Sequence, residues 1–280
     1  MTRPAVTPIE STSRTTTSRT TGPRPVTVAS VPEALQAPGA FDHGRITERK
    51  PIGFPQDGGP LRSMGPLFYW AWARSESTGT IALHPHQGFE ILSYVLRGEL
   101  NHRDTLGNRS RVGVGGAQVQ QAGSGMSHEE ITGPERTDFF QIWLQPDLEA
   151  ALKREPAYGD YEHAAFPVDT KSGATIKTIL GPGSPIALAT EARLVDVRLE
   201  PGATFAHRAE PGRVTVMVTV EGQGMWRDAD GEAVEPVAER DATVIVAEEA
   251  TPLVLHADAD KGQRFVAVEV PTAPPYPLYR

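Results

Sequence analysis

The chain has 280 residues with 27 glycines, 25 prolines and no cysteine, and its formal net charge is −8. Two domains of about 100–150 residues fit this length, and the lack of cysteine excludes disulfides, thiolate metal sites and cysteine nucleophiles. The acidic balance argues against a general affinity for nucleic acid, whose phosphates require a basic face.

The first 26 residues are rich in Thr, Ser, Pro and Arg and hold almost no large apolar side chain. Such a segment cannot offset its ordering entropy by burial, so we predict a disordered tail over residues 1–26. It lacks the apolar middle of a secretory signal, and a flexible tail is favoured over an organelle transit peptide. No apolar run approaches the ~20 residues that span a bilayer, so we expect a cytoplasmic protein without membrane contact.

Short apolar stretches that alternate with glycine-marked turns follow from Val26 onward, for example "FEILSYVLRGEL" and "AQVQQAGSGMSHEEIT". Their lengths and period-two alternation are typical of strands joined by hairpins. The same pattern of short apolar stretches and turns is found in "EARLVDVRLEPGATFAH" and "RVTVMVTVEGQGMWRD". One stretch between them, "QPDLEAALKREPAYGDYEH", has a helical pattern. We therefore predict an all-β fold of two antiparallel barrels or jelly rolls, with domains over 27–145 and 171–280 and a connector over 146–170.

Two pairs of potential metal ligands lie in the first predicted barrel. His84 and His86 flank Pro85, and His128 and Glu130 repeat the same spacing about forty residues later. In a strand, residues i and i+2 point to the same face, so both imidazoles of a pair can reach one ion at about 2.1 Å. The proline faces away and suits a strand end. Three nitrogens and one carboxylate would leave positions open on a five- or six-coordinate metal.

A second carboxylate competes for the fourth position. Glu90 lies four residues after His86 and shares its inward parity if the strand is regular, although Gly88 can mark a bulge that breaks this parity. The general cupin pattern would choose Glu90. Spacing alone leaves Glu90 and Glu130 open. His102 follows a hairpin, and we expect its side chain to be solvated.

The segments "HPHQGFEILSYVLRGELNHRDTLGN" and "GGAQVQQAGSGMSHEE" resemble the pirin family of two-cupin proteins, and the likeness extends over roughly residues 40–270. The resemblance implies a bicupin whose metal ligands are His84, His86, His128 and Glu130, with Glu90 as a structural or supporting acid. It also implies one divalent ion, with Fe(II) favoured and Mn, Co, Ni, Cu or Zn as alternatives.

Several positions around the motif depart from the family pattern. Gln87 stands where an arginine is usual, and Val119 and Gln120 replace a bulky Trp-Met pair. The segment "LFYWAWA" brings Phe68, Tyr69, Trp70 and Trp72, which could line a cavity but which strand spacing more often places in a core. These changes spare the ligands and alter the surroundings of the site.

The second predicted barrel offers only His207 and His256 in comparable positions, with Ala209 where a partner histidine would fall. Two such ligands without a carboxylate do not make a typical metal site. We therefore predict that the domain over 171–280 carries no metal and serves as a lid or packing partner.

The resemblance implies an oxidoreductase like quercetin 2,3-dioxygenase, which acts on a flavonol or another enolisable aromatic with dioxygen, and in which Glu130 could also serve as the catalytic base. A redox-sensing regulator that acts through protein contacts is an alternative. A further alternative is a cyclase or isomerase that uses the metal as a Lewis acid. We expect a monomer with a small aromatic substrate.

Overall fold

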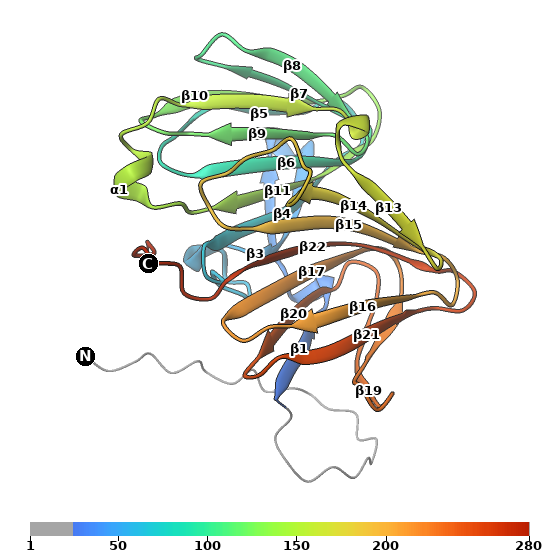
Figure 1. Cartoon of the computed structure of the whole chain (residues 1–280). Coiled ribbons are helices and arrows are strands. Elements are labelled where there is room, and N and C mark those ends of the chain that lie inside the picture. The colour runs from blue at the N-terminus through green and yellow to red at the C-terminus, as the bar shows by residue number, and fades with distance from the viewer. Residues whose placement is uncertain (1–24, 280) are drawn as a thin grey trace.

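A computed structural model describes residues 25–279, and it confirms the predicted all-β fold of two antiparallel jelly-roll barrels. Two seven-stranded sheets face each other across the middle of the molecule, and a four-stranded sheet covers the outer side of each (Figure 1). Each barrel is thus one large and one small sheet. No helix among the described residues is long and apolar enough to cross a membrane.

The first barrel is built mainly from the N-terminal half. Its large sheet has the spatial order β12 (Ala157–Tyr161), β9 (Ala117–Gln121), β6 (Glu90–Arg97), β11 (Thr137–Leu144), β4 (Leu67–Ser75), β3 (Ile46–Ile52) and β2 (Ala37–Phe41). Its small sheet has the order β5 (Thr80–His86), β10 (Met126–Thr132), β7 (Glu99–Asp104) and β8 (Arg109–Gly113). The small sheet carries the predicted ligands.

The second barrel repeats this plan. Its large sheet has the order β1 (Val26–Val31), β20 (Ala242–Ala247), β17 (Arg213–Gly222), β22 (Gln263–Pro271), β15 (Arg193–Leu199), β14 (Ala174–Leu180) and β13 (Val168–Lys171). Its small sheet has the order β16 (Thr204–Ala209), β21 (Thr251–Ala257), β18 (Gly224–Arg227) and β19 (Ala233–Val237). The helical elements are the single-turn α1 (Leu148–Ala151) and 3₁₀ turns at Glu33–Leu35, Asp42–Gly44, Pro55–Asp57 and His163–Ala165.

Two strands cross the domain division expected from the sequence. β1 lies within the predicted first domain but pairs with β20 of the second barrel, from Val26 opposite Ala247 to Val31 opposite Ala242. β12 lies within the predicted connector but pairs with β9 of the first barrel. Local patterns cannot reveal such pairing, because the partner is about two hundred residues away in the first case. The division at 27, 145 and 171 stays a prediction, and the predicted tail over 1–26 falls outside the described residues except for its last two.

A large hydrophobic core joins the two barrels. It is formed by side chains that each large sheet directs away from its own barrel, among them Trp70, Trp72, Phe140, Ile142, Val216, Val218, Val266 and Val268. Burying each large apolar side chain contributes about 1.5–3 kcal/mol, so the two barrels form a permanently packed pair. The preference for a core position is therefore correct for Trp70 and Trp72, which are 0% and 7% exposed.

Candidate metal centre

Three histidines converge inside the first barrel where β5 and β10 pair. His84 lies directly opposite His128, and Met126 lies opposite His86. The Nε2 atom of His128 is 3.0 Å from Nε2 of His84 and 3.0 Å from Nε2 of His86. These residues form a group whose potential ligand atoms all lie within 4.8 Å of one another. The structure thus brings together three of the four predicted ligands.

A bulge in β5 is needed for this convergence. Between the pairs His84–His128 and Ile81–Glu130, β5 has two residues where β10 has one. The two residues of β5 in this bulge, Ala82 and Leu83, both face solvent. Because a bulge shifts the alternation by one, Ile81 and His84 can both point into the barrel although they are three residues apart.

The distances between the nitrogens fit a single ion. Two nitrogens that each lie ~2.1 Å from a metal are about 3.0 Å apart when they subtend a right angle, and about 3.4 Å apart in a tetrahedron. The two observed separations of 3.0 Å match the right angle. The separations from His128 to its two partners therefore suit nitrogens that stand at right angles to each other around one ion.

The backbone sets the tautomer of His84. Its Nδ1 lies 2.8 Å from the carbonyl oxygen of Ala82. A carbonyl oxygen can only accept, so Nδ1 carries the hydrogen and Nε2 keeps its lone pair for a metal. The bulge residue thus both turns His84 inward and orients its ring.

Gln120 does the same for His128. Its side-chain amide lies 2.7 Å from Nδ1 of His128, while the other amide atom, Oε1, is buried without a partner. Turning the amide over lets Oε1 accept the hydrogen of Nδ1, which removes the unpaired oxygen and frees Nε2 for a metal. Of the two positions that depart from the Trp-Met pair, Gln120 thus contacts the site, whereas Val119 faces the core between the barrels.

Burial keeps two of the imidazoles neutral. Desolvation, together with the neighbouring His84, lowers the pKa of His86 to about 4. Desolvation, followed by His84, His86 and His102, lowers the pKa of His128 to about 2. A metal requires the unprotonated ring, so both side chains are ready to bind at neutral pH without losing a proton.

Glu130 is fully buried on the same inward face of β10 as His128, two residues further along. Its carboxylate accepts hydrogen bonds from Ser93 Oγ, at 2.8 Å, and from Gln141 Nε2. Desolvation raises its pKa despite these donors. Glu130 is not among the three residues whose ligand atoms converge, so its role as fourth ligand stays a prediction.

The carboxylate of Glu90 makes its hydrogen bonds away from the three histidines. Its carboxylate accepts the backbone N–H groups of Ala189 and Thr190, at 2.7 and 2.9 Å, and Nε2 of Gln121 at 2.8 Å. Gly88, with φ of +79°, reverses the chain between His86 and Glu90, which breaks the parity that a regular strand would give. Glu90 therefore binds the loop between β14 and β15 of the second barrel, about one hundred residues away.

The prediction that His102 is solvated is wrong. His102 is 1% exposed and lies opposite Glu130 in the β7–β10 pair. Its Nε2 donates to Asp104 at 2.9 Å, and its ring stacks on Tyr158 with centroids 4.0 Å apart. The pattern after a hairpin indicated an exposed turn, but the turn begins only at Asp104, so His102 still belongs to the inward face of β7.

An aromatic cluster borders the histidines. The rings of His86 and Trp143 meet edge to face at 4.9 Å, and Trp143 in turn contacts Phe54, Phe68 and Tyr69. A register shift near the start of β4, opposite Trp143 and Leu144, lets Phe68 and Tyr69 both contact Trp143. Tyr69 faces the site, whereas Trp70 and Trp72 face the core between the barrels.

The sequence analysis missed Glu48. It is 5% exposed, accepts a hydrogen bond from Tyr69 at 3.2 Å, and has a pKa raised to about 7, chiefly by desolvation. The alternation Ile46, Glu48, Lys50 was a usable signal, because it places two charged side chains on the same face of a strand as a buried isoleucine. Glu48 is a second buried acid near Glu130.

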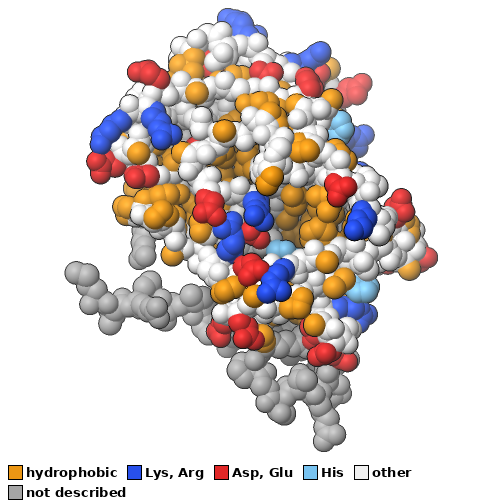
Figure 2. All heavy atoms as spheres, in the orientation of Figure 1, with side chains coloured by type: hydrophobic (Ala, Val, Ile, Leu, Met, Phe, Trp, Pro, Cys, Tyr) orange, Lys and Arg blue, Asp and Glu red, His pale blue; other side chains and the backbone are white. Residues whose placement is uncertain are grey.

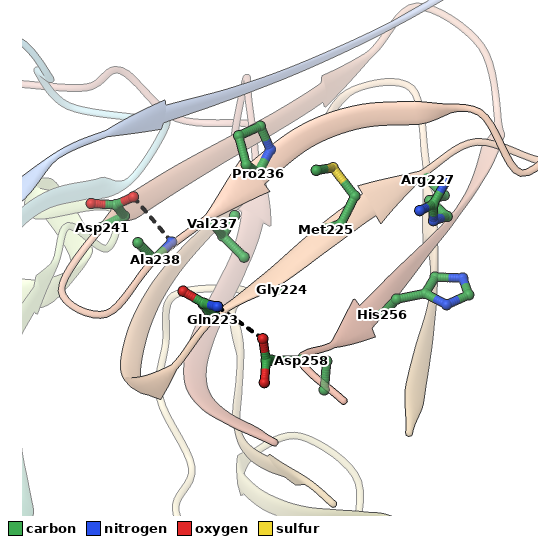
Figure 3. A pocket seen from close by; sticks show the side chains of 11 residues that line it. Gln223, Gly224, Met225, Arg227, Pro236, Val237, Ala238, Asp241, His256 and Asp258 are labelled. Atoms are coloured by element: carbon green, nitrogen blue, oxygen red, sulfur yellow. Dashed lines mark hydrogen bonds between the residues drawn. The ribbon is translucent and has the colours of Figure 1, made fainter. Parts of the chain in front are cut away.

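The histidines of the second barrel do not converge. His207 lines a cavity inside that barrel. His256 instead lines a hollow on the outer side of the small sheet, beside Met225 and Arg227 (Figure 3). Within residues 25–279, the only group of three potential ligands that lie close together is the one in the first barrel. The prediction that the second barrel carries no metal stays a prediction.

The fold and this histidine group define a bicupin with a candidate metal centre. The Pirin family profile matches residues 66–144, which include all four predicted ligands. A pirin-like protein of Caulobacter vibrioides is 30% identical over 189 residues, which cover 66% of this chain and 79% of that protein. The chain belongs to the pirin family.

Two further comparisons agree with this assignment. A Pseudomonas aeruginosa protein, provisionally named as a quercetin 2,3-dioxygenase, is 29% identical over 72% of this chain and 87% of its own length. The bacterial pirin YhhW of Escherichia coli, solved in complex with nickel(II), has a TM-score of 0.70 and 22% identity, and the match covers 88% of this chain and 99% of that one.

Proposed function

We propose that this pirin is a dioxygenase that holds one iron(II) ion through His84, His86, His128 and Glu130 and acts on a flavonol or another enolisable aromatic compound. The observation that carries the proposal is the meeting of three imidazoles, in which Nε2 of His128 lies 3.0 Å from Nε2 of both His84 and His86. With these residues and Glu130 as ligands, the ion would keep coordination positions for a substrate oxygen and dioxygen. The name given to the Pseudomonas aeruginosa relative supports the reaction class.

When bound, the ion supplies open coordination positions and a path for electron transfer between substrate and dioxygen. The chain supplies a base. Burial raises the pKa of Glu130 in the metal-free chain, and in the proposed reaction its carboxylate would take the proton of an acidic enol or phenol. Ser93 and Gln141 hold that carboxylate in place while it does so.

The aromatic cluster is suited to a flat substrate. Trp143 stands edge-on to His86 and is flanked by Phe68 and Tyr69, so a planar ring entering beside the histidines would pack on apolar surface. The hydrogen bond of Gln120 to His128 replaces a bulky contact of the family pattern with a smaller polar one. We infer that the substrate of this chain differs in shape from that of relatives with the bulky pair.

The direct test is incubation of the metal-free chain, reloaded in turn with Fe(II), Mn(II), Co(II), Ni(II) or Cu(II), with quercetin under air. The proposal predicts loss of flavonol absorbance with uptake of one dioxygen per quercetin, and no turnover by the metal-free chain. A panel of other enolisable aromatics extends the test. Absence of metal-dependent oxygen uptake across the panel contradicts the dioxygenase, and turnover without oxygen would point to a cyclase or isomerase.

A further inference from the structure

The interior of the second barrel contains a cavity of about 180 Å³, enclosed between its large and small sheets. A cavity of about 150 Å³ with an apolar lining is enough to accept a benzene ring. Figure 2 shows hydrophobic side chains gathered in a hollow of the lower half, with charged side chains around it. Eleven residues line the cavity, and strand register orders them from one end to the other.

One end of the cavity is polar. Arg193 and Glu269 are partners across β15 and β22, and Glu269 is also opposite Thr215 of β17. His207 lies at the same end, with its Nε2 3.3 Å from Oγ1 of Thr215. Arg193 is exposed, so this end is the mouth.

The other end is apolar and dry. Two residues further along the strands, Val195 faces Ala267, and two further still lies Phe265. From the small sheet, Phe205 packs on Phe265 at 5.2 Å between ring centroids. Phe265 is 1% exposed, so the lining is closed to solvent here.

A hydrogen-bond donor without a partner lies at the closed end. Trp226 lines the cavity and is in register with Phe205, because both pair with Leu255. Trp226 is 1% exposed, and its indole N–H has no acceptor in the chain that the structure describes. A buried donor of this kind costs about 1–3 kcal/mol unless something accepts from it. The N–H itself has almost no surface open to the cavity, so a ligand oxygen at this depth would satisfy it after a rotation of the indole ring.

The charges at the mouth favour an anionic group on the ligand. Arg213 pairs with both Glu269 and Glu191, which leaves Arg193 as a guanidinium without an ion-pair partner among residues 25–279. Burial lowers the pKa of His207, so that ring is neutral and adds no charge at neutral pH. The charges of the two arginines and two glutamates at the mouth sum to zero. An anion is therefore attracted only close to Arg193.

We propose that this cavity is a binding site for a small aromatic acid that carries an oxygen opposite its carboxylate, such as a 4-hydroxybenzoate. The ring fills the space between Val195, Met217 and Ala267. The carboxylate binds Arg193 at the mouth, and the distal oxygen accepts the N–H of Trp226. The site needs no metal and does not depend on the function proposed for the first barrel.

The test is calorimetric titration of the full chain with 4-hydroxybenzoate, benzoate and benzyl alcohol. We expect 1:1 binding in the millimolar range or tighter for 4-hydroxybenzoate, with each of the other two weaker by about three- to tenfold, because each lacks one polar contact. Trp226→Phe should remove the advantage of 4-hydroxybenzoate over benzoate. Arg193→Gln should remove the advantage of 4-hydroxybenzoate over benzyl alcohol, while Arg198→Gln, a change at an exposed arginine on the same strand, should leave that advantage unchanged.

Ala267→Phe should abolish binding of all three compounds by filling the cavity. If that variant does not fold, as judged from its melting temperature, Ala267→Leu fills less space and should weaken all three at least tenfold. The proposal is overturned if 4-hydroxybenzoate does not bind at millimolar concentration, if the filled variant binds as well as the wild-type chain, or if Arg193→Gln and Arg198→Gln have the same effect.

Discussion

The two barrels share one strand order but have opposite interiors. In the first, the small sheet directs four histidines and Glu130 inward, and all but His84 are less than 9% exposed. In the second, the same sheet directs mainly apolar side chains inward, and His207 is the single histidine that lines the cavity. The difference shows that the scaffold itself does not specify a cluster of potential metal ligands.

The strand register identifies the positions at which the inward side chains of the two barrels differ. His84 pairs with His128, as His207 pairs with Leu253. Glu130 of β10 is paired with β5 on one side and with β7 on the other. Leu255 of β21 is likewise paired with Phe205 on one side and with Trp226 on the other. Leucine thus stands where the first barrel has its central histidine and its carboxylate. A cupin barrel gains a cluster of potential metal ligands or an apolar cavity through a few inward positions, while the strand pairing is retained.

The largest effect should come from a matched pair of histidine variants. His128→Ala removes the nitrogen that lies 3.0 Å from both partners and should lower the metal content of the purified chain from about one equivalent to near zero. His207→Ala should leave it unchanged. Elemental analysis of both variants after identical loading is the measurement, and equal losses would erase the distinction between the barrels.

Glu130 and Glu90 provide the next pair. Glu130→Ala should weaken metal binding by about 10–100-fold. Glu90→Ala should retain the metal but lower the free energy of unfolding by about 1–3 kcal/mol, because it leaves the N–H groups of Ala189 and Thr190 unpaired. Metal titration and urea unfolding separate the two effects. Loss of metal in the Glu90 variant alone would mean that Glu90, and not Glu130, is the fourth ligand.

Gln120→Leu should weaken metal binding by about tenfold, because Nδ1 of His128 loses the partner that fixes its tautomer. Gln120→Glu keeps an acceptor at that place and should bind nearly as well as the wild-type chain. Gln118→Leu is a suitable control, since Gln118 donates to the carbonyl of Leu100 and does not contact a histidine. If Gln120→Leu and Gln118→Leu behave alike, Gln120 has no role in orienting His128.

The smallest effect is a dependence of stability on pH in the metal-free chain. The pKa of His86 is about 4 in the folded chain, against an ordinary value of 6.5. Between these values the unfolded chain takes up a proton that the folded chain does not, so stability should fall as the pH falls from 6.5 towards 4. Melting temperatures should show this fall, and His86→Leu should reduce it. An unchanged slope in that variant would mean that His86 is not neutral in the folded chain.

The sequence predicted the fold and the three histidines because both depend on local alternation. Pro85 marks the outward position between two inward imidazoles, and His128 and Glu130 do share one face of β10. The features that were missed depend on distant partners. The crossing of β1, the contact of Glu90 with Ala189 and the stacking of His102 on Tyr158 each join segments that no local pattern connects.

The bulge at Ala82 and Leu83 shows most clearly what a local sequence pattern cannot predict. Regular alternation would place Ile81 and His84 on opposite faces, and only the pairing with β10 reveals that both point inward. The choice between Glu90 and Glu130 was likewise open from spacing, and the turn at Gly88 explains why Glu90 leaves the site.

The most direct test of the account is a crystal structure of the chain loaded with one equivalent of Fe(II) or Ni(II), with anomalous data collected at the absorption edge of the metal. The account predicts one strong peak in the first barrel, about 2.1 Å from Nε2 of His84, His86 and His128, with an oxygen of Glu130 as a further ligand. A peak in the second barrel, or a first-barrel peak that lacks one of the three histidines, would contradict it.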